Sequence, residues 1–451
     1  MRNWERIFNP KTVALVGATE RQGSVGRGIM ENLLLGRDLR KIYPVNPNRK
    51  EVFGLPCLPS LSSIPQKIDL VLIAIPAFSV KKVVEECCQK KVGGIIIISA
   101  GFKEKGGEGK RWEEEIARLV KKAKIPLLGP NCLGIIRPKI RLNASFSPLM
   151  PKKGEIAFIS QSGALIDSVI DRSISENYGF STIISYGNEA DLTLSDFLEF
   201  AGQDKETKVI AIYLEGVKDG QKFMKVAKKI KKPIVALKAG KTEKGKKAVQ
   251  THTGSLAGNQ RVYSAVFKQT GIIEVETLEE LFDIGKAVAW QRSCKNGIGI
   301  ITNGGGAGVL LTDYCQELGI KLPKLKKETL DILEKSGLMH HGYSKRNPLD
   351  IIGDASFKQY QIGIEALLSQ KDIYGLIVIQ TLQSMTNSRR NAEVVVWAKK
   401  KWKEKPIVCC FLGGEGIKEG AEVLAKHKIP NYSELKRAAK AMWSLIEANK
   451  K

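Results

Sequence analysis

One local pattern occurs three times along this 451-residue chain: a short apolar run, a glycine-rich turn, and a segment with the apolar spacing of a helix. The apolar runs cover residues 12–16, 156–160 and 298–302, and at least one glycine follows each of them closely. Continuous apolar strands that alternate with amphipathic helices are typical of parallel sheets covered by helices on both faces. In such sheets, ligands bind beyond the carboxyl ends of the strands, where these glycine turns lie.

The repeat predicts an α/β protein with three doubly wound domains. A length of 451 residues agrees with three domains of about 150 residues each. We expect the domains to cover residues 1–150, 151–292 and 293–451, with a Pro/Lys-rich linker near the first boundary and a short polar linker near the second.

The cysteines and the apolar runs restrict the class of protein further. None of the eight cysteines forms a C-x-x-C pair, and several lie in apolar runs, which predicts buried, reduced thiols and not disulfides or zinc ligands. No apolar run approaches the roughly 18 residues of a membrane span, and the first residues lack the apolar core of a secretion signal. We therefore expect a cytosolic protein that does not bind membranes.

The formal charge of +25 raises nucleic acid as a partner. However, the lysines are scattered over every amphipathic segment, without interleaved arginine and aromatic residues and without a recognisable nucleic-acid module. We predict no nucleic-acid partner, because phosphate-rich small ligands and an acidic protein partner explain the sign of the charge equally well.

The first glycine turn contains Gly17, Gly23 and Gly26, a spacing of six and three, whereas a dinucleotide fingerprint has two and three. The next apolar strand ends in the segment 46–50, Asn-Pro-Asn-Arg-Lys, which supplies amide and cationic groups in place of a ribose-binding carboxylate. A cationic strand end suits a nucleotide with an extra ribose phosphate, so CoA and NADP both qualify. Alternatively, the glycines serve only helix–strand packing.

The second glycine turn, Ser160-Gln-Ser-Gly-Ala164, leaves the first amides of a helix bare, which predicts an anion site. In the same expected domain, Glu215 follows an apolar strand over residues 209–214. A carboxylate there can accept the Nδ1–H of a histidine and raise the nucleophilicity of the other ring nitrogen, or it can be an ordinary solvated glutamate.

His252 is the histidine that this carboxylate could support. It lies in a polar stretch over residues 241–254 that is rich in lysines and small residues, and we interpret this stretch as a mobile loop. Such an imidazole can attack a phosphoryl group, although a loop histidine can also be an inert surface residue. The pair His340–His341 lacks Cys or carboxylate neighbours at metal-ligand spacing, so we predict no metal site on this chain.

Two further turns supply candidate substrate contacts. Asn131 follows a Gly-Pro pair after an apolar strand, and Gly187-Asn188 forms a comparable turn after another. An asparagine in such a turn can donate to a substrate carbonyl or simply cap the turn, and both possibilities stay open here.

Six motifs follow one another in a characteristic order: Gly-Ala-Thr-Glu…Gly-Ser-Val-Gly, Tyr-Pro-Val-Asn-Pro, Gly-Pro-Asn-Cys-Leu-Gly, Ile-Ser-Gln-Ser-Gly-Ala, Tyr-Leu-Glu-Gly and Thr-His-Thr-Gly-Ser-Leu-Ala-Gly. With this set the chain closely resembles the α subunits of NDP-forming acyl-CoA synthetases, specifically the ADP-forming acetyl-CoA synthetases of the succinyl-CoA synthetase superfamily. The resemblance covers essentially the full length.

The resemblance implies a CoA-binding Rossmann-like domain followed by two flavodoxin-like domains. The first flavodoxin-like domain carries a phosphohistidine, and the second contacts a partner. It implies that His252 is phosphorylated and that Glu215 supports it. The implied phosphate-binding residues are Ser160, Gln161, Ser162, Gly163, Ala164 and Gly254. The implied CoA-binding residues are Gly17, Ala18, Thr19, Ser24, Val25, Gly26, Asn46, Ile75 and Pro76. The implied substrate-contacting residues are Asn131, Gly187 and Asn188.

The resemblance also implies the reaction acetyl-CoA + ADP + phosphate = acetate + ATP + CoA, through acyl phosphate and phosphohistidine intermediates. We find no ATP-grasp domain in the sequence, so we expect a separate ATP-grasp β subunit in an α2β2 assembly, with Mg²⁺ and ADP or ATP bound on that partner. The acyl group itself is not determined. Two alternatives stay open: a CoA-binding regulatory module without chemistry, and an NADP-dependent oxidoreductase.

Overall fold

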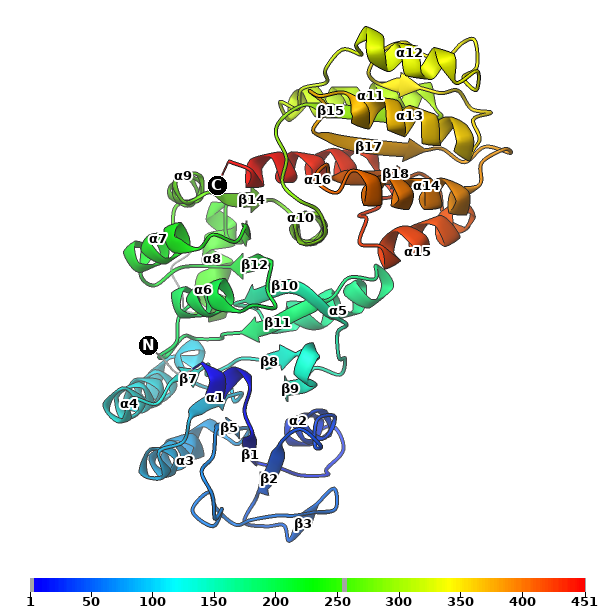
Figure 1. The fold of residues 1–451 in the computed structure, drawn as a ribbon. Helices are drawn as coiled ribbons and strands as arrows, with labels where there is room; N and C mark the ends of the chain where they lie inside the picture. The colour runs from blue at the N-terminus through cyan, green and yellow to red at the C-terminus, as the bar shows by residue number, and fades with distance from the viewer. Residues whose placement is uncertain (1–3, 254–257, 451) are drawn as a thin grey trace. The chain divides into compact units, whose positions relative to one another are not determined.

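The computed structural model describes residues 4–253 and 258–450, with the side chains of residues 251–253 excluded. The chain divides into two compact units, Met1–Glu276 and Thr277–Lys451. Figure 1 shows strands alternating with helices along both units, as the repeated sequence pattern predicts. The predicted α/β class with parallel sheets is confirmed.

The first sheet of unit 1 has five parallel strands in the order β2-β1-β5-β6-β7. Its strands are β1 (Thr12–Val16), β2 (Lys41–Val45), β5 (Leu70–Ile73), β6 (Gly94–Ile97) and β7 (Leu127–Leu128). The helices around it are α1 (Glu5–Phe8), α2 (Val25–Leu34), α3 (Ala77–Lys90) and α4 (Gly107–Ala123). A small antiparallel pair, β3 (Glu51–Val52) and β4 (Leu55–Pro56), follows β2.

The second sheet of unit 1 has seven strands in the order β14-β13-β12-β10-β11-β8-β9. The parallel strands are β10 (Lys153–Ser160), β11 (Phe180–Ser185), β12 (Val209–Leu214), β13 (Ile234–Lys238) and β14 (Ile272–Val275). The helices of this part are α5 (Ala164–Ser175), α6 (Leu194–Gln203), α7 (Gly220–Lys229), α8 (Glu243–Thr253) and α9 (Gln260–Thr270).

The remaining edge of the second sheet is antiparallel. It consists of β8 (Gly134–Arg137) and β9 (Leu142–Ser145), and β8 pairs with β11. These strands precede residue 150 in the sequence, so the chain enters the second sheet before the expected domain boundary. A hairpin of this kind lies outside the strand–turn–helix repeat, which is why the repeat did not indicate it.

The two sheets of unit 1 share one hydrophobic core, in which buried side chains from both sheets are in contact. Phe8, from the short helix before β1, stacks on Phe200 of α6 with 3.6 Å between the ring centroids. Trp4 packs against both rings, at nearly equal distances between the ring centroids. Because apolar burial is the main favourable term in folding, this shared core makes the two sheets one unit.

Unit 2 contains a four-stranded parallel sheet in the order β16-β15-β17-β18. Its strands are β15 (Ile298–Thr302), β16 (Leu349–Asp350), β17 (Gly375–Gln380) and β18 (Ile407–Phe411). Its helices are α10 (Leu278–Trp290), α11 (Gly305–Glu317), α12 (Lys327–Lys335), α13 (Phe357–Ser369), α14 (Ser388–Lys401), α15 (Lys418–Lys426) and α16 (Leu435–Ala448).

Unit 2 begins with α10, which precedes the expected boundary at residue 293. Helix α10 packs against α16, where Arg437 donates from Nε and Nη2 to the buried carboxylate of Asp283 at 2.6 and 2.8 Å. Because a paired buried carboxylate is costly to leave without its partner, this contact ties α10 to the sheet of unit 2.

All eight cysteines are free thiols, and all except the half-buried Cys88 are buried, which confirms the prediction of reduced buried thiols. Within the described part of the chain, no helix is long and apolar enough to cross a membrane.

Candidate active site

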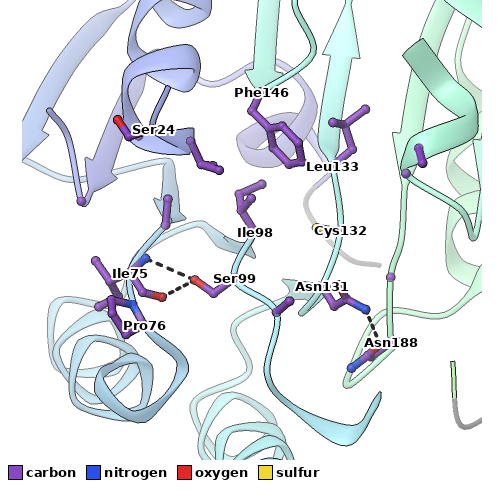
Figure 2. Close-up of a pocket in the computed structure, with 18 of the residues that line it drawn as sticks. Ser24, Ile75, Pro76, Ile98, Ser99, Asn131, Cys132, Leu133, Phe146 and Asn188 are labelled. Atoms are coloured by element: carbon purple, nitrogen blue, oxygen red, sulfur yellow. Dashed lines mark hydrogen bonds between the residues drawn. The ribbon is translucent and has the colours of Figure 1, made fainter. Parts of the chain in front are cut away.

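A cavity of about 910 Å³ lies between the two sheets of unit 1. Its wall combines residues from the ends of β1, β5 and β6 with residues from the β10–α5 turn and from the loops after β7 and β11 (Figure 2). The sequence-predicted residues on this wall are Gly17, Thr19, Ser24, Val25, Gly26, Ile75, Pro76, Asn131, Gln161, Ser162, Gly163, Ala164, Gly187 and Asn188. The predicted glycine turns after β1 and β10 thus line the same cavity.

The first wall depends on close backbone packing at the β1–α2 turn. Gly17 has a φ of +96°, and a Cβ atom there would lie 2.3 Å from the carbonyl oxygen of Ala74. A Cβ atom on Gly26 would lie 2.1 Å from the carbonyl oxygen of Gly17. Only glycine fits such approaches. Gly17 therefore lets the turn pass close to the end of β5, and Gly26 lets the start of α2 sit directly against the end of β1.

Two predicted CoA residues, Ala18 and Asn46, do not lie on the cavity wall. Ala18 is fully buried, and the Asn46 side-chain amide donates a 2.8 Å hydrogen bond to the Ala18 carbonyl oxygen. Their described contacts hold the β1–α2 turn in shape behind the wall.

The second wall is the β10–α5 turn. Ser160 is buried and does not line the cavity; its hydroxyl donates to the Ser162 carbonyl oxygen at 2.7 Å and so fixes the turn. Gly163 is the N-cap of α5, and a Cβ atom there would lie 3.3 Å from the Leu133 side chain. The amides at the start of a helix and its positive end favour an anion, so this wall can hold phosphate.

Gln161 connects this turn to the next strand. Its side-chain oxygen accepts hydrogen bonds from the backbone N–H groups of Glu215 at 2.8 Å and of Gly216 at 3.3 Å. Glu215 is 4% exposed and does not itself line the cavity. Gln161 therefore positions the end of β12, and with it Glu215, relative to the cavity wall.

A buried lysine lies beside Glu215. Lys238, at the end of β13, pairs in register with Leu214, and its ammonium group lies 4.8 Å from the centre of the Tyr263 ring. Burial lowers the pKa of Lys238 to about 8, against the opposing effect of the Glu215 charge, which raises it. The ends of β12 and β13 thus carry a carboxylate and an ammonium group that are close enough for the Glu215 charge to act on Lys238.

Asn188 is held by residues from the helices and loops around the two sheets of unit 1. Its side-chain amide donates to the carboxylates of Glu104 at 2.7 Å and Glu113 at 2.8 Å, and its backbone oxygen accepts from Lys103 and Lys218 at 3.2 and 3.0 Å. Asn131 donates to the Asn188 side-chain oxygen at 3.4 Å (Figure 2). Because the protein engages these atoms, the geometry favours Asn188 as a bridge and not as a freely available ligand.

This network changes the titration of its members. Burial lowers the pKa of Lys218, and the nearby Lys103 charge lowers it further. Burial tends to raise the pKa of Glu104, but the hydrogen bonds from Asn188 and from the Gly101 amide outweigh it and lower that pKa. The network therefore keeps Glu104 ionised as an acceptor for Asn188.

Three family models match consecutive parts of the chain: a CoA binding domain over residues 11–138, a succinyl-CoA ligase like flavodoxin domain over 153–288, and a ligase-CoA domain over 298–444. The ADP-forming acetate–CoA ligase I subunit alpha of Pyrococcus furiosus is 39% identical, over 99% of this chain and 98% of its own length. The chain belongs to the ADP-forming acetate–CoA ligase family.

A solved structure of this family agrees over the whole chain. The dinucleotide forming acetyl-coenzyme A synthetase 1 of Candidatus Korarchaeum cryptofilum, in complex with phosphate and ADP, matches with a TM-score of 0.95 and 37% identity, covering 100% of this chain and 97% of that one. The ADP-forming acetate–CoA ligase I of Archaeoglobus fulgidus is 43% identical over 97% of this chain. This chain spans only 62% of that relative's length.

The histidine expected in this family, His252, lies in the last turn of α8 (Glu243–Thr253). Its side chain and the whole of Gly254 lie outside the described residues. The prediction of a loop over residues 241–254 is wrong for the backbone from Glu243 to Thr253. Thr242 accepts a hydrogen bond from the Gly245 amide at 3.1 Å and so caps a helix that sequence reasoning missed.

Gly23 of the first glycine turn also lines the cavity, although it was not among the predicted CoA contacts. The other lining residues were not predicted: Arg21, Ala74, Ile98, Ser99, Ala100, Cys132, Leu133, Phe146 and Asp167. Ile98, Ser99 and Ala100 directly follow β6, so the rule of carboxyl strand ends could have found them. Ser99 both donates to and accepts from the Ile75 backbone, at 2.5 and 3.2 Å (Figure 2). Leu133 and Phe146 flank the antiparallel hairpin, for which the sequence pattern contains no signal.

Across the described residues, no group of three or more His, Cys, Asp or Glu side chains is arranged to hold a metal ion. The Candidatus Korarchaeum cryptofilum protein was solved in complex with phosphate and ADP.

Proposed function

We propose that this chain is the α-type component of an ADP-forming acyl-CoA ligase, with acetyl-CoA as the first candidate substrate. The reaction is acyl-CoA + ADP + phosphate = carboxylate + ATP + CoA. The observation that carries this proposal is the single cavity that joins the Gly17–Gly26 turn to the start of α5. CoA on the first wall and phosphate on the second would place the thioester beside its nucleophile.

In the first step, a phosphate oxygen attacks the thioester carbonyl carbon, the C–S bond breaks, and CoA leaves as the thiolate. The start of α5 supports this step, because its bare amides and positive end hold the phosphate close to the carbonyl. The Gln161–Ala164 segment lies on the cavity wall as this role requires. The products of the step are acyl phosphate and CoA.

In the second step, a ring nitrogen of His252 attacks the phosphorus of the acyl phosphate, and the P–O bond to the carboxylate breaks. Glu215 would stabilise the imidazolium character that develops, and Gln161 holds the end of β12 in place for this role. A covalent phosphohistidine conserves the thioester energy until ADP accepts the phosphoryl group. The chain would then return to its starting state.

The second half of the reaction needs a nucleotide site, which we assign to a separate ATP-grasp β subunit in an α2β2 assembly. The Pyrococcus furiosus subunit alpha is covered over 98% of its length, whereas the Archaeoglobus fulgidus relative extends well beyond the matched part. This difference supports a family in which the part matched by this chain and the ATP-grasp part are either separate subunits or fused in one chain. Mg²⁺ would accompany ADP or ATP on the partner and neutralise phosphate charge there.

The proposal is tested by His252→Ala in the chain co-expressed with its partner. We expect the wild type to acquire an acid-labile phosphoryl label from acetyl-CoA and labelled phosphate, and the variant to acquire none, because the acceptor nitrogen is gone. CoA binding, measured by calorimetry, should persist in the variant since the first wall is untouched.

The matched control is His427→Ala, which removes an exposed histidine of unit 2. This variant should keep both the label and the rate of ATP formation. ATP formation at the wild-type rate by His252→Ala would exclude the carrier role. A titration in which NADP binds and CoA does not would exclude the ligase assignment as a whole.

A further inference from the structure

Asp167 places a carboxylate on the wall of the cavity. It lies four residues after Gly163, the N-cap of α5, so the two residues share one face of the helix. The neighbouring Ile166 and Ile170 are fully buried and fix the rotation of α5. The first turn of α5 therefore presents both an anion-binding end and a carboxylate to the same cavity.

One oxygen of this carboxylate needs a hydrogen-bond donor. Asp167 Oδ1 is inaccessible to solvent and has no hydrogen-bond partner among residues 4–250 and 258–450. Other polar groups on the wall differ: Ser99, Gln161 and Asn188 all have protein partners. Buried polar atoms are nearly always satisfied, because an unpaired one loses its hydration without compensation. A rotation of the carboxylate toward the cavity, which Asp167 lines, would let a bound molecule with an N–H or O–H group satisfy this oxygen.

A purely structural role accounts for only part of this arrangement. A carboxylate in the first turn of a helix interacts favourably with the helix dipole. However, that interaction does not require an unpaired buried oxygen in a side chain that lines a cavity. Moreover, phosphate at the start of α5 would repel a carboxylate one helical turn away, about 5.4 Å along the axis. A donor on the ligand, between the two anions, offsets this repulsion.

We propose that Asp167 is a specificity-determining residue that accepts a hydrogen bond from a hydroxyl or amino group on the acyl moiety. This inference rests on the proposed function, which places the thioester carbonyl at the start of α5. A substituent two or three bonds along a short acyl chain then lies within reach of the next helical turn. Leu133, beside Gly163, and Phe146 supply apolar surface for the carbon chain of such an acid (Figure 2).

The test compares matched pairs of acids with the chain co-expressed with its partner: propionate with 3-hydroxypropionate, and butyrate with 3-hydroxybutyrate. We expect the wild type to show a kcat/KM at least about tenfold higher for the hydroxy acid of at least one pair, the usual effect of a hydrogen bond to a charged group. In Asp167→Leu this ratio should fall to about one, and in Asp167→Asn to an intermediate value.

The matched control is Asp171→Ala, which removes an exposed carboxylate one turn further along α5. This variant should keep the wild-type ratio. A wild-type ratio near one for both pairs overturns the proposal. An Asp167→Leu variant that keeps the ratio also overturns the proposal. In such a variant, a lower melting temperature would indicate a helix-dipole role for Asp167. A higher KM for CoA would indicate a contact between Asp167 and the pantetheine amides.

Failure of the proposed function is a separate result, since the wild type would then form no acyl-CoA from any acid. In that case calorimetric binding of 3-hydroxybutyrate and butyrate to wild type and Asp167→Leu tests the residue directly. Tighter binding of the hydroxy acid by the wild type alone supports the role of Asp167 in recognition. Equal affinities overturn it.

Discussion

At the scale of single residues, the candidate site depends on charges that the protein buries at a cost. Lys238 is 1% exposed, yet it carries an ammonium group. Among the described residues, the Tyr263 ring, the Ala239 carbonyl and the nearby Glu215 charge compensate it. A buried cation of this kind lowers the free energy of unfolding relative to a neutral side chain, so its presence calls for another explanation. We infer that it serves to place a positive charge beside Glu215.

This buried lysine makes the stability of the chain depend on pH in a defined window. The pKa of Lys238 is about 8 in the folded chain and 10.5 ordinarily, so between these values the unfolded chain binds a proton that the folded chain has released. Stability from this group therefore rises with pH from about 8 to about 10.5 and is constant below that range.

We expect Lys238→Met to lack this rise. The difference in unfolding free energy between wild type and variant should shift in favour of the wild type by about 3 kcal/mol across the window, from 1.36 kcal/mol per pKa unit. Urea unfolding at a series of pH values measures it, with Lys229→Met, an exposed lysine of α7, as the control. Parallel curves for wild type and Lys238→Met would refute this account.

At the scale of elements, the β1–α2 turn is the part that tolerates least change. Gly17 and Gly26 approach each other so closely that a single methyl group on Gly26 would overlap the Gly17 carbonyl oxygen. The start of α2 must move away from β1 to admit that group. Both the packing and the first wall of the cavity depend on this contact.

For Gly26→Ala we expect a loss of about 1–3 kcal/mol of unfolding free energy, the usual effect of overpacking, together with a loss of CoA affinity. Denaturant unfolding and calorimetric titration with CoA check the two effects. Gly220→Ala is the matched control, because Gly220 begins α7 in the same unit and a Cβ atom there meets nothing within 4 Å. Wild-type stability and CoA affinity in Gly26→Ala would show that the turn relaxes freely.

At the scale of the whole molecule, the units of packing do not coincide with the repeats of the sequence. The first two sheets share one core, through contacts such as Phe8 with Phe200, whereas unit 2 has a core of its own. The predicted three-domain division at 150 and 292 stays a prediction. The boundary between the two compact units lies between residues 276 and 277.

We expect fragments 1–276 and 277–451 to fold separately and to unfold cooperatively, because each contains a complete core. Fragment 1–150 should be poorly folded, since it exposes Phe8 and leaves β8 and β9 without the strand β11 that they join. Circular dichroism and thermal unfolding of the three fragments decide this. A cooperative transition in fragment 1–150 would show that the first sheet is an independent domain.

Much of this architecture could be predicted from the sequence because its determinants are local. The strands β1 and β15 coincide with the apolar runs at 12–16 and 298–302, and the fold class followed from their alternation with helices. The turn at 160–164 was recognisable for the same reason, since small polar residues before a periodic apolar stretch favour a helix start. Helix α8 was missed because its Thr242 cap is a single weak signal among many lysines.

The composition of the cavity was decided by tertiary packing. Asn188 meets Glu104 and Glu113 across 84 and 75 positions of sequence, and no local pattern reports such a contact. The hairpin of β8 and β9 brings Leu133 and Phe146 to the wall in the same way. The sequence by itself determined which segments become strands and glycine turns, because backbone sterics and apolar periodicity act over a few residues. Only the packing of two sheets around one core decided which turns face each other, because that choice depends on contacts between distant segments.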